Sequence, residues 1–210
     1  MSLPTFDFSS RRQWLSRCGG GVALLASLAL AGLSGCSDKP AFGGVDITGA
    51  DYASGFTLTD QEGRTRTLAD FKGKVVVLFF GYVQCPDVCP TTLSELAQVK
   101  QLLGADGDRL QGLFISVDPE RDTPEIMKAY MAAFDPSFLA LYARPDELPQ
   151  LAKSFKVYYK KVPGSTPTSY SMDHSAGSYV YDTQGRLRLY ERYGAGAQVI
   201  AADVRQLLSR

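Results

Sequence analysis

The body of the chain contains two cysteines that are separated by only three residues. Cys85 and Cys89 lie in the segment GYVQCPDVCP, from Gly81 to Pro90, and a proline follows each of them. Residues four positions apart share one face of a helical turn, so the two sulfurs can come close enough to form a disulfide or to bind one metal ion. The spacing by itself leaves both kinds of chemistry open.

A metal site needs further ligands, and the chain has a single histidine, His174, in the sequence Asp173-His174-Ser175. Two thiolates and one imidazole form a soft, three-coordinate set that suits Cu(I), and histidine with cysteine also binds Cu(II). A structural zinc site takes four ligands, and the fourth would have to be Asp87 or water. Copper, as Cu(I) or Cu(II), therefore fits this set best.

Three neighbouring side chains could adjust such a site. Asp173 could accept a hydrogen bond from the His174 ring and so orient it. Asp87, between the cysteines, could act as a turn residue, tune the local charge or contact a partner. Met172 offers a soft sulfur, although a methionine in such a segment is more often a packing residue.

Two alternatives to a metal site use the cysteine pair alone. A structural disulfide would gain little stability, because so local a bridge closes a very small loop. A thiol–disulfide exchange protein usually has two residues between its cysteines, and a thiol peroxidase usually has threonine where this chain has Tyr82. The residues alone do not decide between exchange chemistry and metal binding.

The cysteine pair lies between a predicted strand and a predicted helix. The continuous apolar run from Val75 to Phe80 is typical of a central strand buried on both faces. A helix is expected to begin near Pro90, with Thr92 and Glu95 as a capping box. Both thiols would then lie at the carboxyl end of a strand and the amino end of a helix, where open α/β sheets have their sites and the helix dipole favours thiolate.

The order of the predicted elements indicates an α/β protein with a thioredoxin-like fold, in which helices flank a central mixed sheet. An N-terminal β-hairpin precedes the central strand, and a polar loop leads to His174. The predicted elements are a hairpin of 56–58 and 65–68, strands at 75–80 and 110–117, helices from Pro90, Thr123 and Asp146, a hairpin of 178–181 and 187–190, and a helix that ends at Leu208.

The first 35 residues have the features of a bacterial lipoprotein signal peptide. An apolar run from Gly19 to Gly35 is shorter than a membrane span needs, and it ends in Leu33-Ser34-Gly35-Cys36, which resembles a lipobox. Arg11-Arg12 resembles a twin-arginine export signal. We expect a signal peptide at 1–35, acylation of Cys36, a lipidated tether at 36–50 and a domain at 51–210, on the periplasmic side and anchored to the membrane by lipid.

Composition limits the other functions. The 210 residues include 22 basic and 22 acidic side chains, and no basic run with interleaved aromatics suggests a nucleic-acid partner. With 45 % hydrophobic residues, the chain suits one globular domain with appended sequence. After export, an unprotected cysteine pair would be expected to form a disulfide, which makes the spacing of Cys85 and Cys89 meaningful.

Three segments together resemble the Sco (SenC) family of membrane-anchored, thioredoxin-like copper proteins, over about residues 50–210. They are CPDVCP at 85–90, SVDPERDTP at 116–124 and DHS at 173–175. The resemblance implies that Cys85, Cys89 and His174 are the copper ligands. It also implies a local charge network of Asp118, Arg121 and Asp122. Val83 and Gln84, just before the first cysteine, differ from the threonine and small polar residue or histidine that are common there in the family.

The sequence therefore predicts a membrane-anchored copper metallochaperone. The resemblance implies that it delivers one copper ion during assembly of the dinuclear copper centre of cytochrome c oxidase, with the copper-centre subunit of the oxidase or another periplasmic copper protein as its partner. The alternative is a thiol–disulfide oxidoreductase that reduces the cysteines of the copper-accepting partner. A copper- or redox-sensing protein is a third interpretation.

Overall fold

The computed structural model describes residues 41–166 and 169–209. The predicted signal peptide, Cys36 and the first part of the predicted tether lie outside these residues. Within the described ranges, no helix is both long enough and apolar enough to cross a bilayer.

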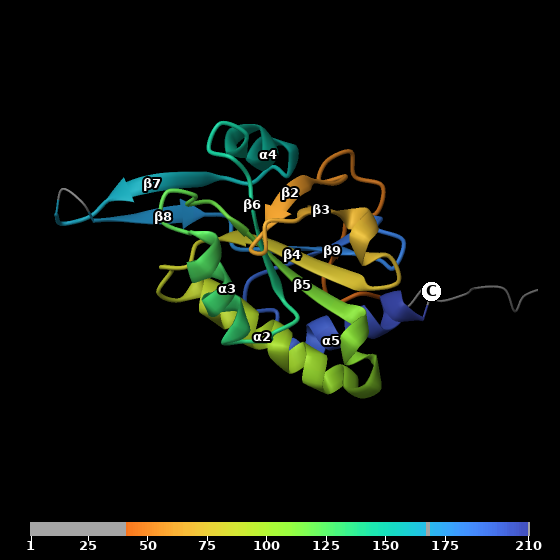
Figure 1. The fold of residues 1–210 in the computed structure, drawn as a ribbon. Coiled ribbons are helices and arrows are strands. Elements are labelled where there is room, and N and C mark those ends of the chain that lie inside the picture. Colours follow the sequence, from red (N-terminus) through yellow and green to blue (C-terminus); the bar gives the residue numbers. More distant parts are fainter. Residues whose placement is uncertain (1–40, 167–168, 210) are drawn as a thin grey trace, which may run out of the picture. The chain divides into compact units, whose positions relative to one another are not determined.

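An eight-stranded sheet forms the centre of the fold, with the strand order β1-β10-β9-β4-β5-β6-β2-β3 (Figure 1). Strands β4, β5 and β6 run parallel, whereas the other neighbours are antiparallel, so the sheet is mixed as predicted. The strands are β1 (Val45–Asp46), β2 (Thr57–Asp60), β3 (Thr65–Thr67), β4 (Val75–Gly81), β5 (Leu110–Ser116), β6 (Leu139–Tyr142), β9 (Ser178–Tyr181) and β10 (Leu187–Glu191).

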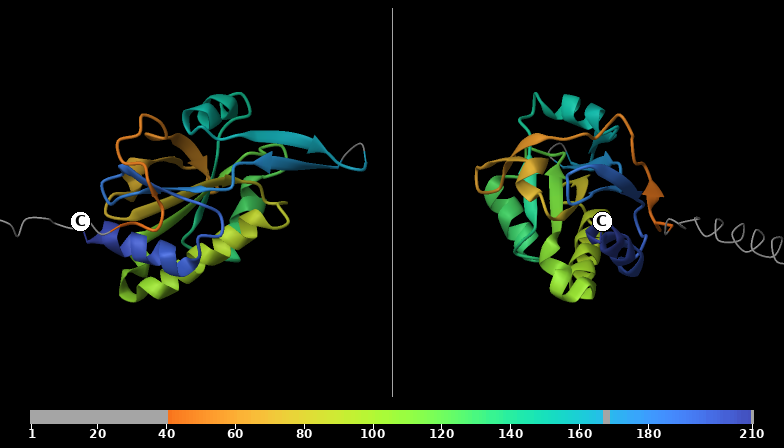
Figure 2. Two further views of the ribbon diagram at one scale, coloured as in Figure 1. Left: turned by 180° about the vertical axis from the view of Figure 1, so that it is seen from behind. Right: turned by 90° about the vertical axis from the view of Figure 1, so that its right-hand side faces the viewer.

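Strand β4 is buried on both faces, because helices cover both sides of the sheet. Side chains alternate along a strand. The odd-numbered residues from Val75 to Phe79 pack with α2, α3 and α5, and the even-numbered residues from Val76 to Phe80 pack with η3 and α4. Figure 2 shows α4 and the pair α2 and α5 on opposite sides of the sheet. The helices are η3 (Leu68–Phe71), α2 (Val88–Leu103), η4 (Gly104–Arg109), α3 (Pro124–Ala132), α4 (Leu148–Ser154) and α5 (Ala197–Leu208).

Helix α2 begins earlier than the sequence predicted. Its first residue is Val88, so Cys89 lies in the first turn and Pro90 is the third helical residue. Proline is tolerated there because the first N–H groups of a helix have no intrahelical partner. Thr92 does not cap the helix: its hydroxyl donates a hydrogen bond of 2.9 Å to the carbonyl of Val88.

The segment before His174 is a β-hairpin, not the polar loop that the sequence predicted. Strand β7 (Tyr159–Pro163) pairs antiparallel with β8 (Tyr170–His174) in a separate two-stranded sheet. Figure 1 shows this hairpin extending beyond the main sheet, with β8 returning toward it. His174 is the last residue of β8 and pairs with Tyr159. Exposed polar residues hid these strands, because the pattern lacks the alternation of a half-buried strand.

The domain also begins before residue 51, the predicted boundary. Strand β1 pairs with β10 at the edge of the main sheet. The backbone N–H groups of Gly43 and Gly44 donate to the Asp203 carboxylate in α5 at 2.9 and 2.8 Å. Part of the predicted tether at 36–50 is therefore folded into the domain. A two-residue strand is too short for sequence periodicity to reveal.

Candidate metal centre

The three predicted metal ligands come together beyond the carboxyl end of β4. Their ligand atoms all lie within 4.8 Å of one another, and Cys89 Sγ is 3.6 Å from His174 Nε2. Cys85 follows β4 in a loop, Cys89 lies in the first turn of α2, and His174 ends β8. Cys89 is completely buried, whereas Cys85 and His174 are half-buried. A ligand can therefore approach from the side of Cys85.

Gly81, the last residue of β4, lies directly against the deeper sulfur. A Cβ atom at this position would be 2.5 Å from Cys89 Sγ and 2.8 Å from Cε2 of Phe114. Any larger residue would push one of these groups away, so the absence of a side chain at Gly81 sets the place of the Cys89 sulfur. The sequence signal was a glycine at the end of an otherwise apolar strand, but only the structure shows which atom fills the space.

The imidazole of His174 is oriented by a backbone group. Its Nδ1 lies 3.0 Å from the carbonyl oxygen of Ser175. A carbonyl can only accept a hydrogen bond, so Nδ1 carries the proton and the lone pair of Nε2 faces Cys89. The expected orienting role of Asp173 is therefore wrong: neighbouring side chains of a strand point to opposite faces, and Asp173 is exposed.

The structure also shows the contacts of Asp87 and Met172, whose roles the sequence left open. The exposed carboxylate of Asp87 accepts hydrogen bonds of 3.4 Å from the hydroxyls of Thr91 and Tyr193. It is the backbone of Asp87 that forms a hydrogen bond with the Cys85 sulfur. Met172 is 8 % exposed and packs in the core on the α4 side of the sheet, as a packing residue would.

The two thiols differ in protonation. A hydrogen bond from the Cys89 thiol lowers the pKa of Cys85 to about 4, and hydrogen bonds from the backbone of Asp87 and Cys89 add to this effect against burial. The pKa of Cys89 is raised, because its proton is held in the hydrogen bond to Cys85 and because burial disfavours a charge there. At neutral pH the site therefore presents one half-exposed thiolate and one buried thiol.

The predicted charge network in the loop after β5 is present, and it contacts both the loop that carries Cys85 and the strand β8 that carries His174. The Arg121 guanidinium pairs with the Asp118 carboxylate at 2.5 Å and donates to the Gln84 side chain at 3.0 Å. It also donates to the carbonyl of Tyr170 at 2.9 Å and lies 3.5 Å from the centre of the Tyr170 ring. Arg121 thus connects the cysteine loop to the first residue of β8.

Asp122 holds the backbone of the loop that leads to Cys85. Its buried carboxylate accepts hydrogen bonds from the Val83 backbone N–H at 3.2 Å and from the Ser116 hydroxyl at 2.6 Å. Burial raises the pKa of Asp122 to about 6, although these two hydrogen bonds oppose the rise. Val83 and Gln84, which depart from the common family pattern, are therefore attached to this network, one by its N–H and the other by its side-chain oxygen.

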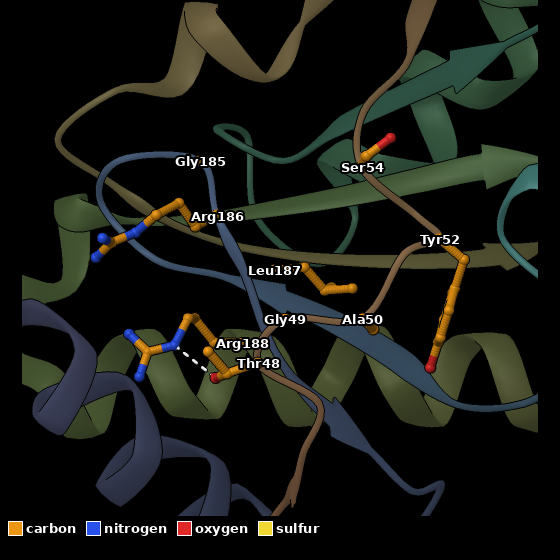
Figure 3. A pocket seen from close by; sticks show the side chains of 9 residues that line it. All are labelled: Thr48, Gly49, Ala50, Tyr52, Ser54, Gly185, Arg186, Leu187 and Arg188. Carbon is orange, nitrogen blue, oxygen red and sulfur yellow. Dashed lines mark hydrogen bonds between the residues drawn. The ribbon is translucent and has the colours of Figure 1, made fainter.

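A separate pocket of about 680 Å³ lies between residues 48–54 and the start of β10 (Figure 3). Arg186 and Arg188, which line it, both pair with the buried carboxylate of Asp182. Arg188 also donates a hydrogen bond of 2.9 Å to the Thr48 hydroxyl, drawn as a dashed line in Figure 3. None of the three metal-ligand candidates lines this pocket, so it is not part of the metal centre.

A mixed α/β sheet with two cysteines and a histidine beyond its central strand defines a thioredoxin-like protein with a candidate metal centre. The sequence model of the SCO1/SenC family matches residues 45–209. The chain therefore belongs to this family, as the motifs predicted.

Individual relatives agree with this assignment. The chain is 39 % identical over 153 residues to bovine "Protein SCO2 homolog, mitochondrial", which covers 72 % of this chain and 58 % of the bovine protein, and so spans less than two thirds of that relative. It is 33 % identical over 152 residues to a SCO2-like protein of Rickettsia felis, covering 71 % of this chain and 74 % of that protein.

Two solved structures that are described with copper bound are also similar. Bradyrhizobium japonicum ScoI has 43 % sequence identity and a TM-score of 0.66, covering 73 % of this chain and 97 % of that chain. Yeast Sco1 has 32 % identity and a TM-score of 0.65, covering 72 % and 85 %. These similarities confirm the predicted thioredoxin-like fold.

Proposed function

We propose that this protein binds one copper ion through Cys85, Cys89 and His174 and passes it to an acceptor protein by ligand exchange. The observation that carries the proposal is the approach of two sulfurs and one imidazole nitrogen to within 4.8 Å of one another. Such a soft donor set fits Cu(I), and Cys with His also fits Cu(II). The similarity to structures with copper bound supports the same metal.

The differences between the ligands suit uptake and release. The Cys85 thiolate is half-exposed and already charged, so it can meet the ion first. Cys89 must lose its proton to bind, so full binding releases one proton and is favoured as the pH rises. A site with only three ligands, two of them only half-buried, lets the thiols of an acceptor enter without full dissociation of the ion.

We further propose that the acceptor is the copper-centre subunit of cytochrome c oxidase, or another periplasmic copper protein, and that a lipid on Cys36 anchors the chain to the membrane. Family membership supports the first part, and the lipobox supports the second. Transfer of copper from the loaded protein to the purified acceptor domain tests the partner. Loss of detergent-phase partitioning in Cys36→Ser tests the anchor.

Copper titration of the reduced protein, in competition with a chromogenic chelator, tests the ligand set. Changes to groups that support metal ligands cost about tenfold to hundredfold in affinity, so removal of a ligand in His174→Ala should cost more than about hundredfold. Asp173→Ala is the matched control, because it removes the exposed neighbour on the same strand. Binding by His174→Ala as tight as that of the parent would exclude the histidine from the site.

The unequal thiols also favour a second function, reduction of a disulfide in the copper acceptor. The Cys85 thiolate would attack the acceptor disulfide and form a mixed disulfide. Cys89, after losing its proton, would attack the Cys85 sulfur, leaving a Cys85–Cys89 disulfide and two thiols on the acceptor. This activity should persist without metal and in His174→Ala. Absence of acceptor reduction by the metal-free protein would exclude it.

A further inference from the structure

Tyr82 contacts all three candidate metal ligands but is not itself a ligand of the proposed copper site. It follows the last residue of β4, precedes Cys85 by three positions, and is only 3 % exposed. This is the position at which a thiol peroxidase would have threonine, and the proposed function does not account for the large aromatic residue found here.

The backbone of Tyr82 holds the two cysteines. Its carbonyl accepts a hydrogen bond of 3.1 Å from the N–H of Cys85. Its backbone also forms a hydrogen bond with the Cys89 sulfur. These contacts do not depend on the side chain, so a substitution of Tyr82 leaves the groups that place the two sulfurs in position.

The side chain of Tyr82 contacts the strand that carries the histidine. Its ring meets the His174 imidazole edge to face, with the ring centres 5.9 Å apart and the planes at 87°. Its hydroxyl forms a hydrogen bond with the backbone of Met172, two residues before His174 in β8. The Arg121 guanidinium also lies 5.7 Å from the ring centre. The ring therefore contacts both the charge network and the imidazole.

We propose that Tyr82 is a positioning residue that holds the His174 imidazole within bonding reach of the two sulfurs. The inference rests on the proposed copper site. The carbonyl of Ser175 fixes one edge of the imidazole, and rotation about that contact is blocked by the Tyr82 ring. Without the ring, Nε2 is free to leave its place 3.6 Å from Cys89 Sγ, while both sulfurs stay where they are.

A double-mutant cycle with Cu(I) as the probe tests this role. Tyr82→Leu should weaken Cu(I) binding by about tenfold to hundredfold, the cost of losing a group that orients a metal ligand. Tyr82→Phe keeps the ring and should lose less than about tenfold, because it removes a single hydrogen bond. In the His174→Ala background, Tyr82→Leu should cause no further loss, because its effect acts through the histidine. An equal loss in both backgrounds would overturn the proposal.

Phe80→Leu is the matched control for general loss of packing. Phe80 is 1 % exposed, lies two residues earlier on the same core face, and meets Phe155 edge to face rather than the histidine. It should lower the melting temperature about as much as Tyr82→Leu but leave Cu(I) affinity unchanged. A comparable loss of Cu(I) affinity in this control would show that Tyr82 acts only through packing.

The metal-free protein gives a second readout. His174 is the only histidine, so its two ring nitrogens can be assigned in a ¹⁵N NMR spectrum without ambiguity. The parent and Phe80→Leu should show the Nδ1–H tautomer, and Tyr82→Leu a mixture of tautomers; an unchanged tautomer in Tyr82→Leu would contradict the proposed role. If His174→Ala itself binds Cu(I) like the parent, the proposed site fails. If only Tyr82→Leu binds like the parent, the site stands and this inference fails.

Discussion

Glu191 and Asp203 form a buried carboxyl pair beneath the segment that enters the domain, and each is 2 % exposed. Asp203 accepts the N–H groups of Gly43 and Gly44, whereas no donor in the described part of the chain reaches either oxygen of Glu191. Glu191 and Asp203 also form a hydrogen bond with each other. Because an ionised carboxylate can only accept a hydrogen bond, one of these two carboxyl groups must carry a proton. Burial, the hydrogen bond and the charge of Asp203 raise the pKa of Glu191 to about 8.

This proton makes the folded state less stable as the pH rises. The unfolded chain loses the proton near the ordinary glutamate pKa of 4.5, and the folded chain keeps it until about 8. The stabilisation is therefore complete below about pH 4.5 and is lost between these two values. At about 1.4 kcal/mol for each pH unit, the total loss is about 5 kcal/mol, a large part of the stability of an ordinary domain.

Urea unfolding of the reduced, metal-free protein measures this effect by comparison with Glu191→Gln. Cys85 contributes with the opposite sign in an overlapping range, because its pKa is lowered to about 4, so the pH profile of the parent alone is not decisive. Both chains share the contribution of Cys85, and the sites are separate, so the difference between the two isolates Glu191. Relative to the parent, Glu191→Gln should gain about 1.4 kcal/mol for each pH unit between about pH 5 and pH 8.

The exposed residue Glu147 supplies the control, since Glu147→Gln should shift stability by less than about 1 kcal/mol at any pH. The titration of Asp122, whose pKa is about 6, is shared by both chains and therefore cancels in the difference. A difference between the parent and Glu191→Gln that stays flat from about pH 6.5 to pH 8 would refute the shared proton.

Three further predictions concern the candidate metal centre. Gly81→Ala should lower the free energy of unfolding in urea by about 1–3 kcal/mol and also weaken copper binding. Gly55→Ala, where an added Cβ meets open space, should do neither. Full copper affinity in Gly81→Ala would show that the Cys89 sulfur can move without loss of binding. Arg121→Gln should lower the free energy of unfolding by about 3–5 kcal/mol, because it leaves the buried Asp118 carboxylate without its ion-pair partner. The exposed Arg144→Gln should lower it by less than about 1 kcal/mol, and equal losses in the two variants would argue against the charge network. Alkylation of Cys85 by iodoacetamide should be nearly as fast at pH 6 as at pH 8, because its pKa is about 4; a rate that rises tenfold with each pH unit in this range would contradict the low pKa.

The local sequence pattern correctly predicted the strands and helices whose residues show a clear apolar pattern. The run from Val75 to Phe80 is so uniformly apolar that only a strand covered on both faces can bury it, and β4 has this place. The polar segment before His174 carried no such signal, because its two strands pair only with each other and most of their side chains are exposed or half-buried. Its strands were therefore missed, and so was the two-residue strand β1.

The residue types by themselves determined the donor chemistry of the candidate centre, two thiols and one imidazole, and placed the thiols between a strand and a helix. The tertiary structure decided the rest. Cys89 and His174 are 85 positions apart, and no local pattern fixes how hairpin β7–β8 docks against the cysteine loop. The packing of Phe114 against Gly81 and the ring of Tyr82 beside the imidazole are likewise contacts between segments distant in sequence. Such contacts depend on non-local packing, which sequence periodicity does not encode.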